Sequence, residues 1–155
     1  DTATKWGVPL KLKDARRIQK RWRERNQPIQ DFWKELARVA MDLIKGKPNR
    51  AAPAGRCIMR RVSDRLVIEL PSGRHLHYWQ PKIMKAVRKF DYVTEDGDIE
   101  SDESEIDVIK FWGPGKRGIM EVKETYGGKL CENVTQACAR DLLAHALVKV
   151  DKAPV

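Results

Sequence analysis

The sequence has few of the residues that cross-link a fold or carry it through a membrane. Its 155 residues include three cysteines, Cys57, Cys131 and Cys138, which are too few and too dispersed for a disulfide framework or a paired-cysteine metal site. No apolar run approaches the roughly 18 residues of a membrane-spanning helix, and the N-terminus lacks the charged and apolar pattern of a signal peptide. These absences argue against a disulfide-stapled secreted domain and against helical membrane spans, so we expect a cytoplasmic chain that has no membrane partner.

Acidic residues are also scarce in the first part of the chain. Residues 1–90 contain 23 Lys and Arg against 8 Asp and Glu, whereas residues 91–107 contain nine acids and no base. The net charge is +9. A basic body of this kind is the usual electrostatic footprint of a protein that binds a phosphate backbone. The acidic run is typical of a solvated, partly disordered loop, which is what we expect for residues 91–107.

The hydrophobic pattern divides the chain into four parts and predicts an α+β fold. A narrow and a broad helical stripe in residues 1–48 predict an N-terminal helical hairpin. Residues 49–90 are expected to be a linker followed by small antiparallel strands, and residues 91–107 are the acidic loop. Residues 108–155 are expected to be a strand hairpin followed by a long C-terminal amphipathic helix.

That last helix carries the most informative stretch, which reads TYGGKLCENVTQACARDLLAHAL from Thr125. Two glycines break the preceding strand-like run, and an apolar stripe then recurs at helical spacing through Cys131, Val134, Cys138 and Leu142. The opposite stripe collects long hydrogen-bond donors that could reach a nucleic-acid groove: Lys129, Asn133, Gln136 and Arg140. An ordinary solvated helix face is the alternative interpretation of this stripe.

This run resembles the late palm helix of family A DNA polymerases in the form carried by phages and prophages. In that family the helix lies along the minor groove of the primer–template duplex, and its glutamine contacts the terminal base pairs. The resemblance gives that role to Gln136. The family's Arg and Asn positions hold Gly128 and Glu132 here, while Lys129 and Asn133 are each displaced by one residue. Lys129 and Asn133 are therefore candidates only.

A second phrase, LPSGRHLHY from Leu70, resembles the family's loop and strand between the fingers helices and the late palm helix. A Gly-Arg pair is typical there, which makes Arg74 a candidate contact to the nucleic-acid backbone. An ordinary surface arginine is the alternative. With Arg140 from the donor stripe, the expected nucleic-acid contacts are Gln136, Asn133, Lys129, Arg140 and Arg74.

The resemblance extends over nearly the whole chain, with residues 1–48 similar to the later fingers helices. Family A polymerases transfer nucleotides by a two-metal mechanism in which carboxylates hold magnesium and a fingers helix grips the triphosphate. The resemblance implies that these motifs lie upstream of Asp1 and downstream of Val155. We therefore expect a fragment of a DNA-directed DNA polymerase that is inactive alone and has no catalytic residue or metal ligand of its own. Its expected partners are the primer–template duplex and the remainder of a magnesium-dependent polymerase.

Two other interpretations remain open. The first predicted helix is crowded with Lys and Arg, so the chain could be a stand-alone basic nucleic-acid-binding module without enzymatic activity. Alternatively, the basic first helix could fold against the chain's own acidic insert or against an acidic partner. Apolar surface left without neighbours would promote self-association in any fragment of this kind.

Overall fold

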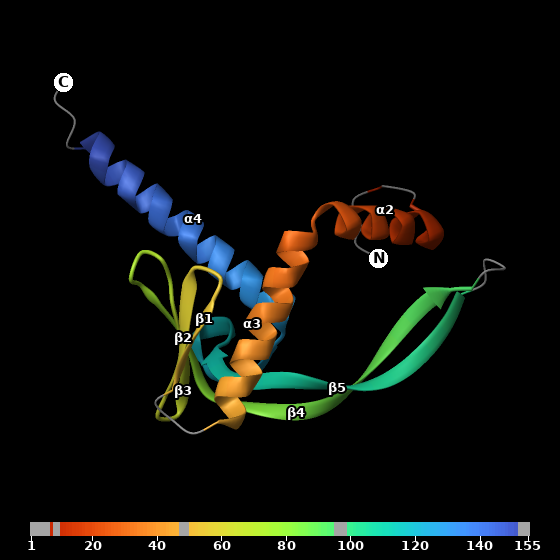
Figure 1. The fold of residues 1–155 in the computed structure, drawn as a ribbon, viewed down its shortest axis with the longest axis horizontal. Coiled ribbons are helices and arrows are strands. Elements are labelled where there is room, and N and C mark those ends of the chain that lie inside the picture. Colours follow the sequence, from red (N-terminus) through yellow and green to blue (C-terminus); the bar gives the residue numbers. More distant parts are fainter. Residues whose placement is uncertain (1–6, 8–9, 47–49, 95–98, 152–155) are drawn as a thin grey trace. The chain divides into compact units, whose positions relative to one another are not determined.

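The computed structural model describes Gly7 and residues 10–46, 50–94 and 99–151, and within these residues the chain is α+β, as predicted. The elements follow one another in this order: α2 (Leu12–Arg25), α3 (Gln27–Lys45), β1 (Ala51–Ala54), β2 (Cys57–Val62), β3 (Arg65–Glu69), β4 (His75–Val93), β5 (Ile99–Pro114), a 3₁₀ turn η1 (Lys116–Gly118), β6 (Met120–Thr125) and α4 (Gly127–Asp151). The six strands form one sheet in sequential order from β1 to β6 (Figure 1). Every helix in the described part of the chain is too short or too polar to cross a bilayer.

The chain divides into two compact units. One contains residues 1–30 and 86–106, which include α2 and the distal parts of β4 and β5; the other contains residues 31–85 and 107–155. The two helices expected in the N-terminal hairpin are both present and are separated at Asn26. The two helices belong to different units, however. Helix α2 groups with residues 86–106, whereas most of α3 groups with residues 31–85 and 107–155.

The larger unit has a core between α3, the sheet and the first half of α4. Helix α3 buries one stripe, Leu36, Val39, Ala40 and Leu43, whose spacing places these residues on one helical face. The sheet contributes alternate residues such as Met59, Leu66 and Ile68, and α4 contributes Leu130 and Val134. In Figure 1 the N-terminal end of α4 lies beside α3, whereas its second half extends away from the sheet.

The structure of the acidic segment differs from the predicted loop. Residues 91–107 were expected to form a loop, but β4 continues to Val93 and β5 occupies Ile99–Pro114; residues 95–98 lie outside the described residues. The reason is countercharge across the ribbon that β4 and β5 form. Lys85 Nζ lies 2.9 Å from Asp107 Oδ1, and Lys89 Nζ lies 3.1 Å from Glu103 Oε1. Opposite charges placed across an antiparallel pair stabilise the pairing.

The prediction of a linker after residue 48 was also wrong. The expected linker after residue 48 contains β1, whose Ala51 pairs with Arg60 and whose Pro53 pairs with Ile58. Proline is tolerated in β1 because this strand lies at the edge of the sheet. In α4, the apolar stripe is buried at Cys131 and Val134, whereas the Leu142 side chain at its far end is 72% exposed.

Candidate nucleic-acid interface

The position of α4 is set where β6 ends. The helix begins directly after Thr125 and Tyr126, and the amide of Leu130 donates to the carbonyl oxygen of Tyr126 at 2.9 Å. A Cβ on Gly127 would collide with the carbonyl oxygen of Trp33 on α3, so this close approach of the two helices requires glycine. The first turn of α4 contains no acidic residue, so its positive dipole end faces no carboxylate of its own helix.

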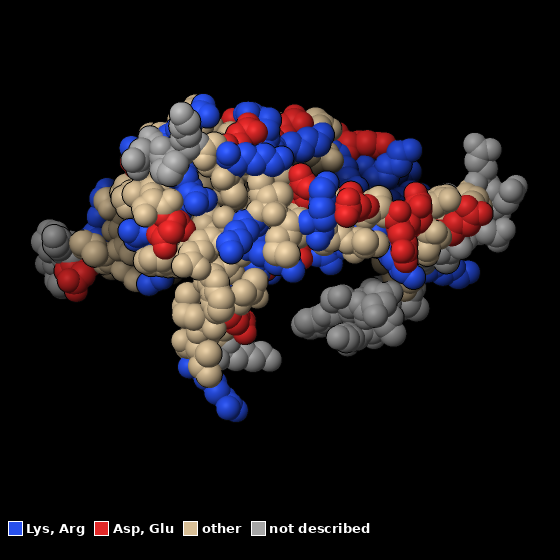
Figure 2. Space-filling view, turned by 90° about the horizontal axis from the view of Figure 1, so that it is seen from below, with Lys and Arg blue, Asp and Glu red and all other residues tan. Residues whose placement is uncertain are grey.

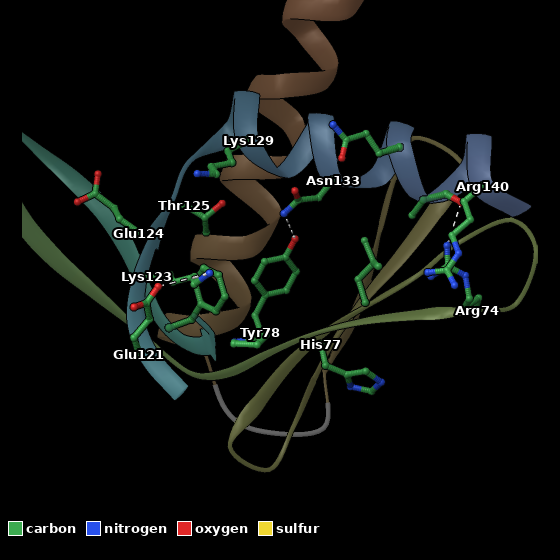
Figure 3. A pocket seen from close by; sticks show the side chains of 15 residues that line it. Arg74, His77, Tyr78, Glu121, Lys123, Glu124, Thr125, Lys129, Asn133 and Arg140 are labelled. Carbon is green, nitrogen blue, oxygen red and sulfur yellow. Dashed lines mark hydrogen bonds and ion pairs between the residues drawn. The ribbon is translucent and has the colours of Figure 1, made fainter. Parts of the chain in front are cut away.

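A cavity of about 940 Å³ lies between the N-terminal half of α4 and the strands β4, β5 and β6 (Figure 3). It is lined by Arg74, Leu76, His77, Tyr78, Phe111, Pro114, Glu121, Lys123, Glu124, Thr125, Lys129, Asn133, Gln136, Ala137 and Arg140. All five residues that the sequence proposed as nucleic-acid contacts are in this lining. The structure therefore brings Arg74 of the turn before β4 together with the donor stripe of α4.

The central donor of the stripe, Gln136, is exposed. Its Nε2 donates to Glu132 Oε1 at 3.1 Å, a contact between surface side chains one helical turn apart. Lys129 and Arg140 are also exposed, and neither makes an ion pair or a side-chain hydrogen bond with any residue that the structure describes. These three side chains can therefore turn toward a ligand without breaking a buried contact.

Asn133 is held more firmly. Its Nδ2 donates to the hydroxyl oxygen of Tyr78 at 2.9 Å (Figure 3). Tyr78 is 3% exposed and packs edge-on against Phe111, with ring centroids 4.9 Å apart. Burial raises the pKa of the Tyr78 hydroxyl, which therefore stays protonated near neutral pH. Asn133 thus links α4 to β4, and its amide is already engaged by the fold.

Arg74 is likewise engaged. Its Nε donates to Asp141 Oδ1 at 2.7 Å, and its Nη2 donates to the carbonyl oxygen of Ala137 at 2.9 Å. Ser72 Oγ donates to the other oxygen of the same carboxylate, Asp141 Oδ2, at 2.6 Å. Hydrogen bonds from Ser72 and Arg74 hold the pKa of Asp141 below its usual value. Arg74 therefore clamps the turn before β4 to α4, and two of its three side-chain nitrogens donate hydrogen bonds within the chain.

Sequence reasoning missed the contribution of β6. Lys123 and Thr125 both line the cavity, and Lys123 Nζ lies 3.6 Å from Glu121 Oε1. Thr125 is 1% exposed, and its hydroxyl has no hydrogen-bond partner within the described residues. The alternation of strand residues places 123 and 125 on one face, so a strand prediction combined with this period of two would have indicated them. The lining has four Lys and Arg against two Glu, which favours an anionic ligand.

Within the residues that the structure describes, no set of side chains fits a pair of magnesium ions. Across the ranges that the structure describes, no group of three or more His, Cys, Asp and Glu side chains is arranged to hold a metal. The cavity lining contains two carboxylates, Glu121 and Glu124, and Glu121 Oε1 lies 3.6 Å from Lys123 Nζ. No metal-dependent step is therefore assigned to these side chains.

Comparison with known proteins supports a polymerase relationship. The chain is 35% identical over 136 residues to a DNA polymerase of Bacillus phage SP02. The match covers 86% of this chain and 18% of the phage protein, so the chain spans less than a fifth of that relative. No protein-family model matches the sequence, and no solved structure matches the fold. Most of the chain is thus related to a phage DNA polymerase, as the sequence predicted.

Proposed function

We propose that this chain is the part of a family A DNA polymerase that contacts the primer–template duplex, with fingers and palm elements around the cavity beside α4. The observation that carries the proposal is that Arg74, Lys129, Asn133, Gln136 and Arg140 line one cavity on a chain related to a phage DNA polymerase. In this proposal Gln136 contacts the terminal base pairs, while Lys129 and Arg140 contact phosphates.

The chemistry of the donors suits that task. The minor groove presents acceptors at similar positions for A·T and T·A pairs and adds little sequence information. A donor such as Gln136 Nε2 would therefore test the shape of a base pair without selecting its sequence. Lys129 and Arg140 are eleven residues apart, which is roughly 16 Å along a helix. That span corresponds to about five base pairs of duplex, so the two cations can bracket the base pairs that Gln136 contacts.

The second half of α4 supports the proposal that the polymerase contains further elements. Its large apolar side chains are between 52% and 74% exposed: Leu142, Leu143, Leu147, Val148 and Val150. A helix segment with this many large apolar side chains is normally buried against another element. We propose that the remainder of the polymerase covers this half. In the same proposal, that remainder supplies the magnesium-binding carboxylates and the triphosphate-binding helix, and the isolated chain is inactive.

Duplex binding by the 155-residue chain tests the proposal. Fluorescence anisotropy with a labelled duplex gives the dissociation constant at several salt concentrations. Lys129→Gln should reduce the slope of log K against log salt by about 0.9, because one phosphate contact is lost. Gln136→Met should weaken binding roughly two- to tenfold with no change in slope, because it removes a neutral hydrogen bond.

Lys149→Gln is the matched control, since Lys149 is an exposed lysine of α4 outside the cavity lining. It should leave the slope unchanged. Equal effects of Lys129→Gln and Lys149→Gln would contradict the proposed interface. A primer-extension assay with magnesium tests the fragment separately: we expect no incorporation by the isolated chain, and robust incorporation would show that it carries its own catalytic residues.

A further inference from the structure

Helix α2 has more positive charge than its surroundings neutralise. Its 14 residues include seven Lys and Arg and two acids, and all seven cations are exposed. Arg17 Nη2 pairs with Asp14 Oδ1 at 3.2 Å. By contrast, Lys20 and Arg21 make no ion pair or hydrogen bond to any of the described residues. The helix thus presents unpaired cations over a wide face.

The ribbon of the same unit carries the opposite charge. Residues 99–106 of β5 contain four acids and no base: Glu100, Asp102, Glu103 and Glu105. Glu103 pairs with Lys89 at 3.1 Å, and Glu100 Oε2 accepts a hydrogen bond from the Tyr92 hydroxyl at 2.7 Å. In the space-filling view, acidic side chains gather toward the tip of the ribbon with basic side chains beside them (Figure 2).

Helix and ribbon are in contact. Arg16 Nη2 donates to the carbonyl oxygen of Asp91 on β4 at 2.7 Å, and α2 falls in the same compact unit as residues 86–106. This bond uses a backbone acceptor, so it neutralises no carboxylate. None of the seven α2 cations forms an ion pair with an acid of β5 within the described residues. The two surfaces can therefore act on each other only through longer-range electrostatics, which salt screens over about 10 Å at 0.1 M.

We propose that the cationic face of α2 is a second binding surface for a nucleic-acid backbone, separate from the cavity beside α4, and that the acids of β5 lower its affinity by partly neutralising its potential. The ligand chemistry is a row of phosphates, which a single strand or a duplex can supply.

Three sets of substitutions in the 155-residue chain test the proposal. The helix variant is Lys20→Gln with Arg21→Gln, chosen because neither side chain has a partner to lose. The ribbon variant is Glu100→Gln, Asp102→Asn and Glu103→Gln, which retains side-chain size and neutralises three acids. The third set combines both. Binding to a labelled 20-nucleotide single strand and to the corresponding duplex is measured by anisotropy across a salt series.

The helix variant should reduce the salt slope by about 1.4 for the single strand or about 1.8 for the duplex, because two phosphate contacts are lost. The ribbon variant should bind roughly fivefold more tightly near 50 mM salt, and this gain should shrink as salt increases. In the combined variant the gain should fall below about twofold, because the cations that the acids influence are missing. The nucleic acid whose slope falls by its own expected amount is the one that α2 binds, and an unchanged slope for both would contradict the proposal.

Matched controls separate these effects from net charge. Lys34→Gln with Arg56→Gln removes two exposed cations of the larger unit, and neutralising Asp42, Asp64 and Asp151 to asparagine removes three exposed acids there. If the controls change binding as much as the helix and ribbon variants, or if the ribbon gain persists in the combined variant, the proposal is wrong. If the α2 variants behave as expected while Lys129→Gln has no effect, the α2 surface is supported and the α4 interface is contradicted. If Lys129→Gln lowers the slope while the α2 variants have no effect, the α4 interface is supported and the α2 surface is contradicted.

Discussion

Replacing Gly127 by alanine tests how closely α3 and α4 must approach each other. A Cβ at this position would collide with the carbonyl oxygen of Trp33 and would lie 3.0 Å from the Trp33 carbonyl carbon and 3.2 Å from Ala37 Cβ. Carbon atoms in optimal contact are about 3.5–4.0 Å apart, so the two helices would have to separate by about 1 Å. Two of the three obstructing atoms are backbone, which a side-chain rotation cannot remove.

The adjacent glycine provides the matched control. A Cβ on Gly128 would meet only the ring of Tyr126, at 3.1 Å, and Tyr126 is exposed and free to rotate. Replacing glycine by alanine inside a helix gains up to about 1 kcal/mol, and forcing atoms into a filled core costs about 1–3 kcal/mol. Gly127→Ala should therefore lose about 1–2 kcal/mol of unfolding free energy, whereas Gly128→Ala should be neutral or gain up to about 1 kcal/mol.

Urea unfolding followed by tryptophan fluorescence and circular dichroism measures both free energies. The two variants make the same substitution at neighbouring positions in the first turn of α4 and change the entropy of the unfolded chain equally. The difference between their unfolding free energies therefore reports the contact with α3. Moving the start of α4 should also displace Lys129 from the cavity, and duplex binding by folded Gly127→Ala should be weaker than by Gly128→Ala. A Gly127→Ala chain as stable as Gly128→Ala would refute the close packing of α3 and α4.

Two further predictions concern the contacts that hold α4. Hydrogen bonds from Ser72 and Arg74 lower the pKa of Asp141, so the ionised carboxylate stabilises the fold above its unfolded pKa of about 3.9. This stability is lost as the pH falls through the lower pKa of the folded state. Asp141→Asn should therefore flatten the acid side of a plot of urea midpoint against pH, and an unchanged plot would contradict the clamp. Tyr78→Phe leaves the Asn133 amide without its partner and should cost about 1 kcal/mol in the same unfolding assay; no loss would show that this hydrogen bond contributes nothing.

Local sequence signals predicted the helix α4 and placed the four donors on one side of it, because both features depend on neighbours in the chain. The strand β6 ends at Thr125, just before the two glycines that begin α4, and the helical period places residues 129, 133, 136 and 140 along one side. The clamp on α4 could not be predicted from the sequence, because Arg74 and Asp141 are 67 residues apart in the chain. Sequence spacing gives no information about such a contact until the fold brings the two side chains together.

The acidic run shows why a local charge pattern misled the prediction. Considered alone, residues 91–107 repel one another and contain no base, which favours a solvated loop. The lysines that pair with Asp107 and Glu103 lie on the preceding strand, at Lys85 and Lys89. Leu142 illustrates a related limit: periodicity shows which side of a helix is apolar, but it does not show whether another element is present to cover that side.

These contacts divide α4 into two halves with different roles. Its first half is held by the approach of Gly127 to α3, by the Asn133–Tyr78 hydrogen bond and by the clamp on Asp141. Those contacts lie around the cavity and fix the backbone from which Lys129 and Gln136 project, so the chain itself determines the geometry of the proposed interface. Beyond Asp141 the helix is exposed on all sides, and no described residue fixes its direction. A polymerase that used α4 for duplex contact would therefore need its remaining elements to cover the second half, while the first half would keep its shape without them.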